Sequence, residues 1–151
     1  MERSFIYDKA FSRNIGWVTE AEQAVLRGKR VAIGGAGAVG SFYANTFARL
    51  GFGKFVLADF DTYDLVNFNR QLGATMSTLG QPKSEVIRRM ILDINPEADI
   101  RVFSEGVTGA NLPEFLRDVD FYVDGLDFFA FDARQQTFAQ CAELGIPSTT
   151  C

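Results

Sequence analysis

A glycine-rich turn between a short apolar run and a helical pattern constrains this chain most. The apolar residues Val31-Ala32-Ile33 precede the turn, and a second apolar run ends at Asp59. Backbone N–H groups at such a helix start bind phosphate, and an acid at the end of the next strand binds ribose hydroxyls. Asp59 follows the turn by about 20 residues, the spacing expected of a ribose-binding acid. The predicted nucleotide site comprises Gly35, Gly37, Ala38, Val39, Gly40 and Asp59.

The composition limits the kinds of partner and compartment. The chain has 151 residues and a formal net charge of −4, so no broad basic surface is available for nucleic acid. No apolar run approaches the roughly 18 residues that a membrane span needs, and the first residues show no leader. These features predict a cytoplasmic protein without nucleic-acid or membrane partners, and they favour a protein partner.

The inventory of reactive side chains is short. The chain contains no histidine, which excludes imidazole catalysis and histidine-ligated metals. Its two cysteines, Cys141 and Cys151, give neither a disulfide framework nor a paired-cysteine zinc clip. Carboxylates, amides and cations therefore have to carry any chemistry.

Strand and helix patterns alternate along the chain. Thr19 and Glu22 have the spacing of a capping box. Three helical patterns stop at glycines, namely Gly28, Gly51 and Gly145. The predicted helices are Thr19–Arg27, Ala38–Leu50, Pro82–Ile94, Asn111–Arg117 and Ala130–Leu144. The predicted strands are Lys29–Gly34, Lys54–Asp59, Asp99–Phe103, Asp120–Asp124 and Pro147–Cys151.

This alternation predicts one α/β domain over residues 1–151, with residues 1–28 as an N-terminal helical arm. The expected fold is a doubly wound, mostly parallel, Rossmann-like sheet in strand order 3-2-1-4-5, with helices on both faces. Its site should lie at the carboxyl ends of strands one, two and four. Residues 60–80 lack a period and are expected to form a functional loop. The chain stops near its fifth strand, so we expect a truncated or minimal domain.

Polar and basic side chains follow the second strand. They are Asn67, Arg70, Gln71 and Lys83. An arginine fork and a lysine point charge can stabilise charge on a leaving pyrophosphate. The alternatives are turn or capping chemistry for the two amides and a solvated helix-start side chain for the lysine. The set favours ATP over a nicotinamide dinucleotide.

Acids and phenylalanines follow the fourth strand. Acids at a strand end can bind Mg²⁺ together with substrate phosphates. Asp127 lies beyond the strand, where the pocket is expected, and is the candidate functional acid, whereas Asp124 suits the end of the strand or a turn cap. The stretch Phe128-Phe129-Ala130-Phe131 is expected to form core or the wall of an adenine pocket, the alternative being an exposed partner surface.

These residues resemble the ThiF/MoeB/HesA adenylyltransferases, the superfamily that includes the ubiquitin-activating enzymes. The resemblance runs from about Phe11 to the end of the chain. It is most specific in Asp59-Phe60-Asp61, Asn67-Phe68-Asn69-Arg70-Gln71, Gly80-Gln81-Pro82-Lys83 and Leu126-Asp127. The resemblance implies that Asp59 holds the ribose and Asp127 the Mg²⁺. It also implies that the phosphates are held by Asn67, Arg70 and Lys83, while the same pocket is lined by Asp61 and Gln71.

The N-terminal Phe11-Ser12-Arg13 is similar to the family's Arg-Tyr-x-Arg element. The last arginine of that element crosses a dimer interface to reach the partner's ATP, which implies a homodimer and this role for Arg13. Two positions depart from the family pattern. Val66 stands where Ser is usual, and Phe128 stands where Asn is frequent.

The resemblance implies ATP-dependent adenylation of a carboxylate with release of pyrophosphate. The expected substrate is the C-terminal glycine of a ubiquitin-like or sulfur-carrier protein, and the implied catalytic residues are Arg70, Lys83, Asp127 and Arg13. A carboxylate is already ionised at neutral pH, so positioning and charge neutralisation suffice without a base. The alternatives are an NAD(P)-dependent oxidoreductase and a non-catalytic nucleotide-binding module.

Overall fold

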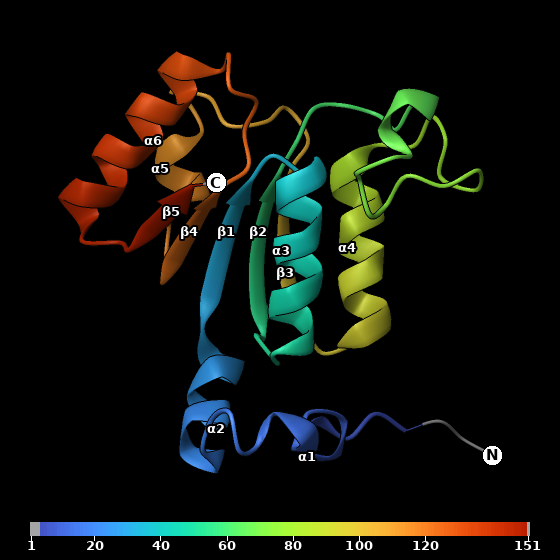
Figure 1. The fold of residues 1–151 in the computed structure, drawn as a ribbon. Coiled ribbons are helices and arrows are strands. Elements are labelled where there is room, and N and C mark those ends of the chain that lie inside the picture. The colour runs from blue at the N-terminus through green and yellow to red at the C-terminus, as the bar shows by residue number, and fades with distance from the viewer. Residues whose placement is uncertain (1–3, 151) are drawn as a thin grey trace.

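The computed structural model describes residues 4–150, and residues 1–3 and 151 lie outside the described part. Five parallel strands form one sheet in the order β3-β2-β1-β4-β5 (Figure 1). The strands are β1 (Arg30–Gly34), β2 (Lys54–Ala58), β3 (Asp99–Phe103), β4 (Phe121–Asp124) and β5 (Ser148–Thr150). The predicted strand order and parallel sheet are confirmed. The prediction that β5 includes Cys151 falls outside the described residues.

Helices cover both faces of this sheet, as predicted. One face carries α3 (Ala38–Arg49) and α4 (Lys83–Ile94), and the other carries α5 (Leu112–Phe115) and α6 (Phe131–Leu144) (Figure 1). Because central parallel strands are buried on both faces, β1, β2 and β4 consist mostly of buried apolar residues, whereas β3 and β5 at the edges of the sheet are more polar and partly exposed. Among residues 4–150, no helix is long and apolar enough to cross a membrane.

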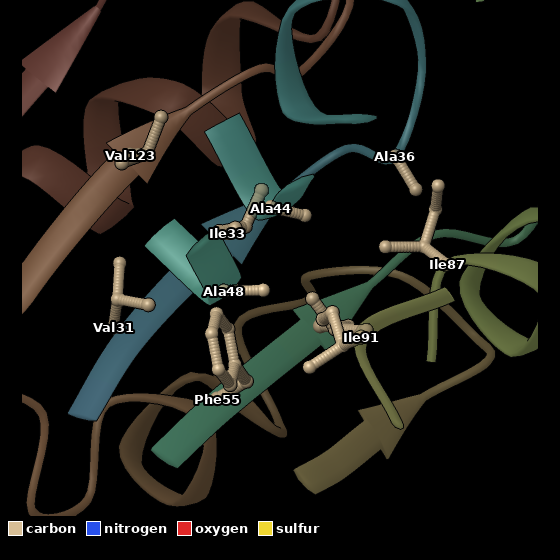
Figure 2. Close-up of a cluster of buried hydrophobic side chains, with 10 residues drawn as sticks. Val31, Ile33, Ala36, Ala44, Ala48, Phe55, Ile87, Ile91 and Val123 are labelled. Atoms are coloured by element: carbon tan, nitrogen blue, oxygen red, sulfur yellow. The ribbon is translucent and has the colours of Figure 1, made fainter. Parts of the chain in front are cut away.

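Alternate residues of β1 pack into two separate hydrophobic cores, one on each face of the sheet. Val31 and Ile33 face α3 and α4, whereas Ala32 packs with Tyr122 toward α5 and α6. Figure 2 shows the first core, which includes Phe55 of β2, Ala48 of α3 and Ile91 of α4. Gly40, Ser41, Ala44 and Ala48 of α3 are buried, and their small size lets this helix approach the sheet closely.

Local helix signals agree with the structure at most positions. The capping box between Thr19 and Glu22 begins α2 (Glu20–Gly28), and Gly145 ends α6 in the left-handed conformation. Two predictions differ. The helix predicted over residues 111–117 is shortened to α5, where the chain turns at once toward β4. The loop over residues 60–80 contains the short 3-10 helix η2 (Leu65–Asn67).

The N-terminal arm is anchored to the end of α3. It contains α1 (Tyr7–Ala10), the 3-10 helix η1 (Ser12–Asn14) and α2. The Tyr7 hydroxyl donates to the Gly51 carbonyl at 2.5 Å, and the Gln23 amide donates to the Leu50 carbonyl at 2.9 Å. The last carbonyls of a helix have no hydrogen-bond donor within the helix. Here side chains of the arm donate to the Leu50 and Gly51 carbonyls at the end of α3. The arm therefore lies at the end of the sheet opposite the carboxyl ends of the strands (Figure 1).

Replacement of Tyr7 by Phe tests this anchor. We expect Tyr7→Phe to lower the free energy of unfolding by about 1–2 kcal/mol, because the buried Gly51 carbonyl loses a donor. The matched control is Tyr63→Phe. The Tyr63 hydroxyl is buried and has no hydrogen-bond partner within residues 4–150, so its loss should be nearly neutral. Urea unfolding of both variants gives the comparison, and equal destabilisation would contradict the anchor.

Candidate nucleotide site

A cavity of about 330 Å³ opens at the carboxyl ends of β1, β2 and β4. It is lined by most of the residues that the sequence predicted for cofactor binding. These are Gly35, Gly37, Ala38, Val39, Asp59, Asp61, Arg70, Gln71 and Lys83, joined by the predicted metal ligand Asp127. The predicted residues Gly40 and Asn67 are absent from this lining.

The glycine turn brings backbone to the cavity wall. Gly35 has a φ of +84°, which favours glycine, and a Cβ there would overlap the Gly125 carbonyl. A Cβ at Gly40 would overlap the Gly35 carbonyl, so this glycine acts in packing the turn against α3. Gly37 caps the start of α3 without a side-chain hydrogen bond. The start of α3 can therefore present its backbone N–H groups to phosphate.

Asp59 is fixed beside the turn by backbone donors. Its Oδ2 accepts from the Ala36 N–H at 2.6 Å, and its Oδ1 accepts from the Asp61 N–H at 2.8 Å. Burial raises the pKa of Asp59, although these hydrogen bonds and the nearby Lys83 ammonium oppose the rise. A carboxylate has about four acceptor positions, so each oxygen can still accept a ribose hydroxyl.

The two cations are held differently. Lys83 is only 6% exposed, and its Nζ donates to Asp61 Oδ2 at 2.8 Å. The alternative prediction, that Lys83 is a solvated side chain at the start of its helix, is therefore wrong. Arg70 is exposed and donates to the Val66 carbonyl at 2.9 Å. The pair places one preorganised and one adjustable positive charge at the same cavity.

Two amides of the loop have separate environments. Asn67 Oδ1 accepts from the Asp64 N–H at 2.9 Å, so this side chain caps η2 within the loop. Gln71 is buried in the cavity wall, and its Oε1 has no hydrogen-bond partner within the described part of the chain. A buried acceptor without a partner is costly, and a hydroxyl or amine of a ligand can satisfy it.

Comparison with known proteins identifies the family of this chain. Residues 11–150 match the sequence model of the ThiF family. The chain belongs to the ThiF family. It is 35% identical over 138 residues to the tRNA threonylcarbamoyladenosine dehydratase of Bacillus subtilis, covering 91% of this chain and 54% of that protein. It is 32% identical over 128 residues to the sulfur carrier protein ThiS adenylyltransferase of Escherichia coli, covering 85% and 50% of the two proteins.

The fold of this ThiF-family chain is similar to that of an ATP-bound structure. The E. coli tRNA N6-threonylcarbamoyladenosine dehydratase in complex with ATP matches it with a TM-score of 0.91 at 27% identity. The match covers 99% of this chain and 61% of that one. The ThiF-family chain spans about half the length of the curated relatives it matches.

The last residue of β4, Asp124, and the later Asp127 have different environments. Asp124 is buried, where its Oδ2 accepts from Arg134 Nε at 2.8 Å and from the Thr150 hydroxyl at 2.9 Å. It therefore ties β4 to α6 and β5, as its predicted structural role requires. Sequence reasoning missed Arg134, because nothing local pairs it with a strand end ten residues earlier.

Asp127, unlike Asp124, presents an exposed carboxylate to the cavity. It is exposed at the cavity, and its Oδ1 accepts from the Phe129 N–H at 3.0 Å. Among residues 4–150, no group of three or more acids and cysteines could hold a metal by itself. Mg²⁺ commonly takes one or two carboxylates and completes its shell with phosphate oxygens and waters, so a single aspartate fits this ion.

The phenylalanines after Asp127 contradict their prediction. Phe128, Phe129 and Phe131 were expected in the core or an adenine-pocket wall, but they are 76%, 88% and 67% exposed. The reason is the position of α6, which buries only Thr137 and Cys141. Phe128 and Phe129 lie in the turn before α6 and Phe131 is the first residue of this helix, and none of these three side chains lines the cavity.

Arg13 lies in η1, on the anchored arm, and does not line the cavity. The neighbouring Asn14 side chain donates to the Arg49 carbonyl at 3.2 Å, which holds this segment at the end of α3. Arg13 is therefore remote from the cavity of its own chain.

Proposed function

We propose that this ThiF-family chain is an ATP-dependent adenylyltransferase domain that activates a carboxylate. The observation that carries the proposal is the meeting of Arg70, Lys83 and Asp59 around the glycine turn in one cavity. A dinucleotide needs no such group of cations, whereas a triphosphate does. The fold shared with an ATP-bound relative supports the same choice.

The proposed reaction joins two anions. A substrate carboxylate attacks the α-phosphorus of ATP, a new C–O–P linkage forms, and the bond from this phosphorus to pyrophosphate breaks. The carboxylate enters already ionised, so no side chain has to remove a proton. Charge neutralisation and alignment are the catalytic requirements.

The residues of this chain meet those requirements in separate ways. Asp59 accepts hydrogen bonds from the ribose hydroxyls, and the backbone N–H groups at the start of α3 bind phosphate. Lys83, kept in place by Asp61, and Arg70 neutralise the phosphates and the departing pyrophosphate. When bound, Mg²⁺ supplies charge neutralisation at the phosphate oxygens, and Asp127 is its proposed ligand. Cys141 is a poor acyl acceptor, because it is buried and burial raises its pKa to about 11.

The proposed substrate is the C-terminal glycine of a sulfur-carrier or ubiquitin-like protein. The name of the E. coli sulfur carrier protein ThiS adenylyltransferase supports this substrate. The net charge of −4 supports it as well, because a negatively charged chain disfavours binding of nucleic acid. A second candidate is the carboxylate of a threonylcarbamoyl group on tRNA, favoured by the B. subtilis relative. Both candidates share the adenylation step.

ATP–pyrophosphate exchange on the purified chain tests the proposal. We expect exchange when a sulfur-carrier protein ending in Gly-Gly is added, and little with threonylcarbamoylated tRNA. Exchange with the tRNA alone would favour the second candidate. NADH binding tighter than Mg-ATP binding would indicate an oxidoreductase. Tight Mg-ATP binding without exchange on any carboxylate would indicate a non-catalytic module.

Replacement of Asp127 by Asn tests the proposed metal ligand. The amide keeps the volume and loses the charge, so we expect at least tenfold slower exchange at limiting Mg²⁺ and partial recovery at high Mg²⁺. The melting temperature without ligand should stay unchanged, because this side chain is exposed. A lower melting temperature with unaltered Mg-ATP binding would assign Asp127 a structural role.

The proposed homodimer makes Arg13 testable by complementation. Arg13→Ala and Arg70→Ala proteins should each be impaired, and their mixture should regain up to a quarter of wild-type exchange. One heterodimer site would then combine an intact cavity with an intact Arg13. Light scattering measures the assembly in parallel. A fully active monomer would contradict the shared site.

A further inference from the structure

Exposed aromatic side chains stand next to Asp127 and Ala130 at the edge of the nucleotide cavity. We name Phe128, Phe129 and Phe131 the phenylalanine rim. The first two rings pack edge to face with centroids 5.5 Å apart, which makes them one surface. Asp127 and Ala130, which are direct sequence neighbours of the rim residues, line the cavity. The rim is therefore continuous with the site where the reaction takes place.

Exposure of this extent has a physical cost. An aromatic side chain can bury about 150–250 Å², and grouped exposed aromatics commonly mark a binding surface. A single exposed aromatic has no such meaning. Trp17, on the arm at the opposite end of the sheet, is 93% exposed and gives a natural control.

The charges around the rim define its occupant. Residues 127–133 contain the exposed acids Asp127 and Asp132 and no lysine or arginine. Arg134, the next basic residue, is engaged by the buried Asp124. A polynucleotide would bring phosphates to this acidic and apolar surface without a cation to meet them. An apolar polypeptide segment with neutral or basic neighbours fits it.

We propose that the phenylalanine rim binds the apolar residues just before the C-terminal carboxylate of a protein substrate. This inference rests on the proposed function, which requires a carboxylate to enter this cavity. With the tail extended across the rim, its last residues reach past Asp127 to the phosphates. The rim then selects substrates by the side chains that precede the terminal glycines, while Arg70 and Lys83 act on the nucleotide.

Fluorescence anisotropy with labelled peptides tests the rim. Two heptapeptides end in Gly-Gly, one with leucine and valine before the glycines and the other with serine at those positions. Each is titrated with the full chain, with and without Mg²⁺ and the unreactive α,β-methylene analogue of ATP. The variants are the double substitution Phe128→Ser and Phe129→Ser, and the control Trp17→Ser.

The wild-type chain and the Trp17→Ser control should bind the apolar peptide at least tenfold more tightly than the double variant does. They should also bind the serine peptide at least tenfold more weakly than the apolar one. The affinity for the ATP analogue should stay within twofold in all proteins, which shows that the cavity is intact. Circular dichroism verifies that the double variant is folded.

Several outcomes would overturn the inference. They are undetectable peptide binding, equal affinity for the two peptides, and equal affinity of wild type and double variant. Binding of an RNA stem-loop that is lost in the double variant would assign the rim to nucleic acid instead. Failure of the ATP analogue to bind would contradict the proposed function but would not decide the role of the rim. The peptide preference is also measured without nucleotide, and that measurement tests the rim separately.

Discussion

Replacement of Arg70 by Ala is expected to slow ATP–pyrophosphate exchange by about 10- to 100-fold. A charge-assisted hydrogen bond contributes about 1.5–3 kcal/mol, which corresponds to that loss when the contact forms with the reacting phosphates. The melting temperature should not change, because the side chain is exposed and its partners are in its own loop. Exchange kinetics and thermal unfolding together separate catalysis from folding.

Arg88→Ala is the matched control for Arg70→Ala. Arg88 is a half-exposed arginine on α4 that pairs with Glu85 one turn away at 3.7 Å and does not line the cavity. Its loss should leave exchange within twofold of wild type. Equal exchange in the Arg70→Ala and wild-type proteins would contradict the phosphate role of Arg70.

Replacement of Gly40 by Ala is expected to cause the largest loss of stability, about 3 kcal/mol. Its Cβ would overlap the Gly35 carbonyl and lie 3.1 Å from the Ile33 side chain, so the turn and β1 would have to separate. For a domain of this size the melting temperature should fall by about 6–12 °C. Affinity for Mg-ATP should fall with it, because Gly35 belongs to the same turn.

Gly28→Ala controls for the loss of glycine itself. This helical position has open space around its Cβ, so we expect a gain of about 0.5–1 kcal/mol. Differential scanning calorimetry of both variants gives the comparison. A Gly40→Ala protein as stable as wild type would show that the turn can rearrange.

The sequence predicted those features whose cause is local. Thr19 and Glu22 lie three residues apart and form the predicted box, and Gly51 and Gly145 take the positive φ that helix ends favour. The order of the sheet followed from the alternation of strands and helices, because parallel neighbours need crossover helices. Asp59 reached the cavity because its strand ends beside the glycine turn.

Features that depend on distant contacts were not predicted. The burial of Lys83 depends on Asp61, 22 residues earlier, and the anchor of the arm joins Tyr7 to a carbonyl 44 residues away. The capping role of Asn67 had a local signal, since Asp64 stands three residues before it. The exposure of Phe128 could not be read from hydrophobicity, because it depends on which distant side chains pack against the turn before α6.

Strand β1 pairs with β4, which is synthesised much later, so the pairing is delayed during translation. Arg30 and Asp120, which flank this pairing, are 90 residues apart in the sequence. At about 5–20 residues per second, translation needs roughly 5–18 s to deliver the second strand after the first. Through that interval one edge of β1 offers unpaired backbone groups beside apolar side chains, the arrangement that invites wrong strand pairing. This edge of β1 is covered only when β4 has left the ribosome and paired with it.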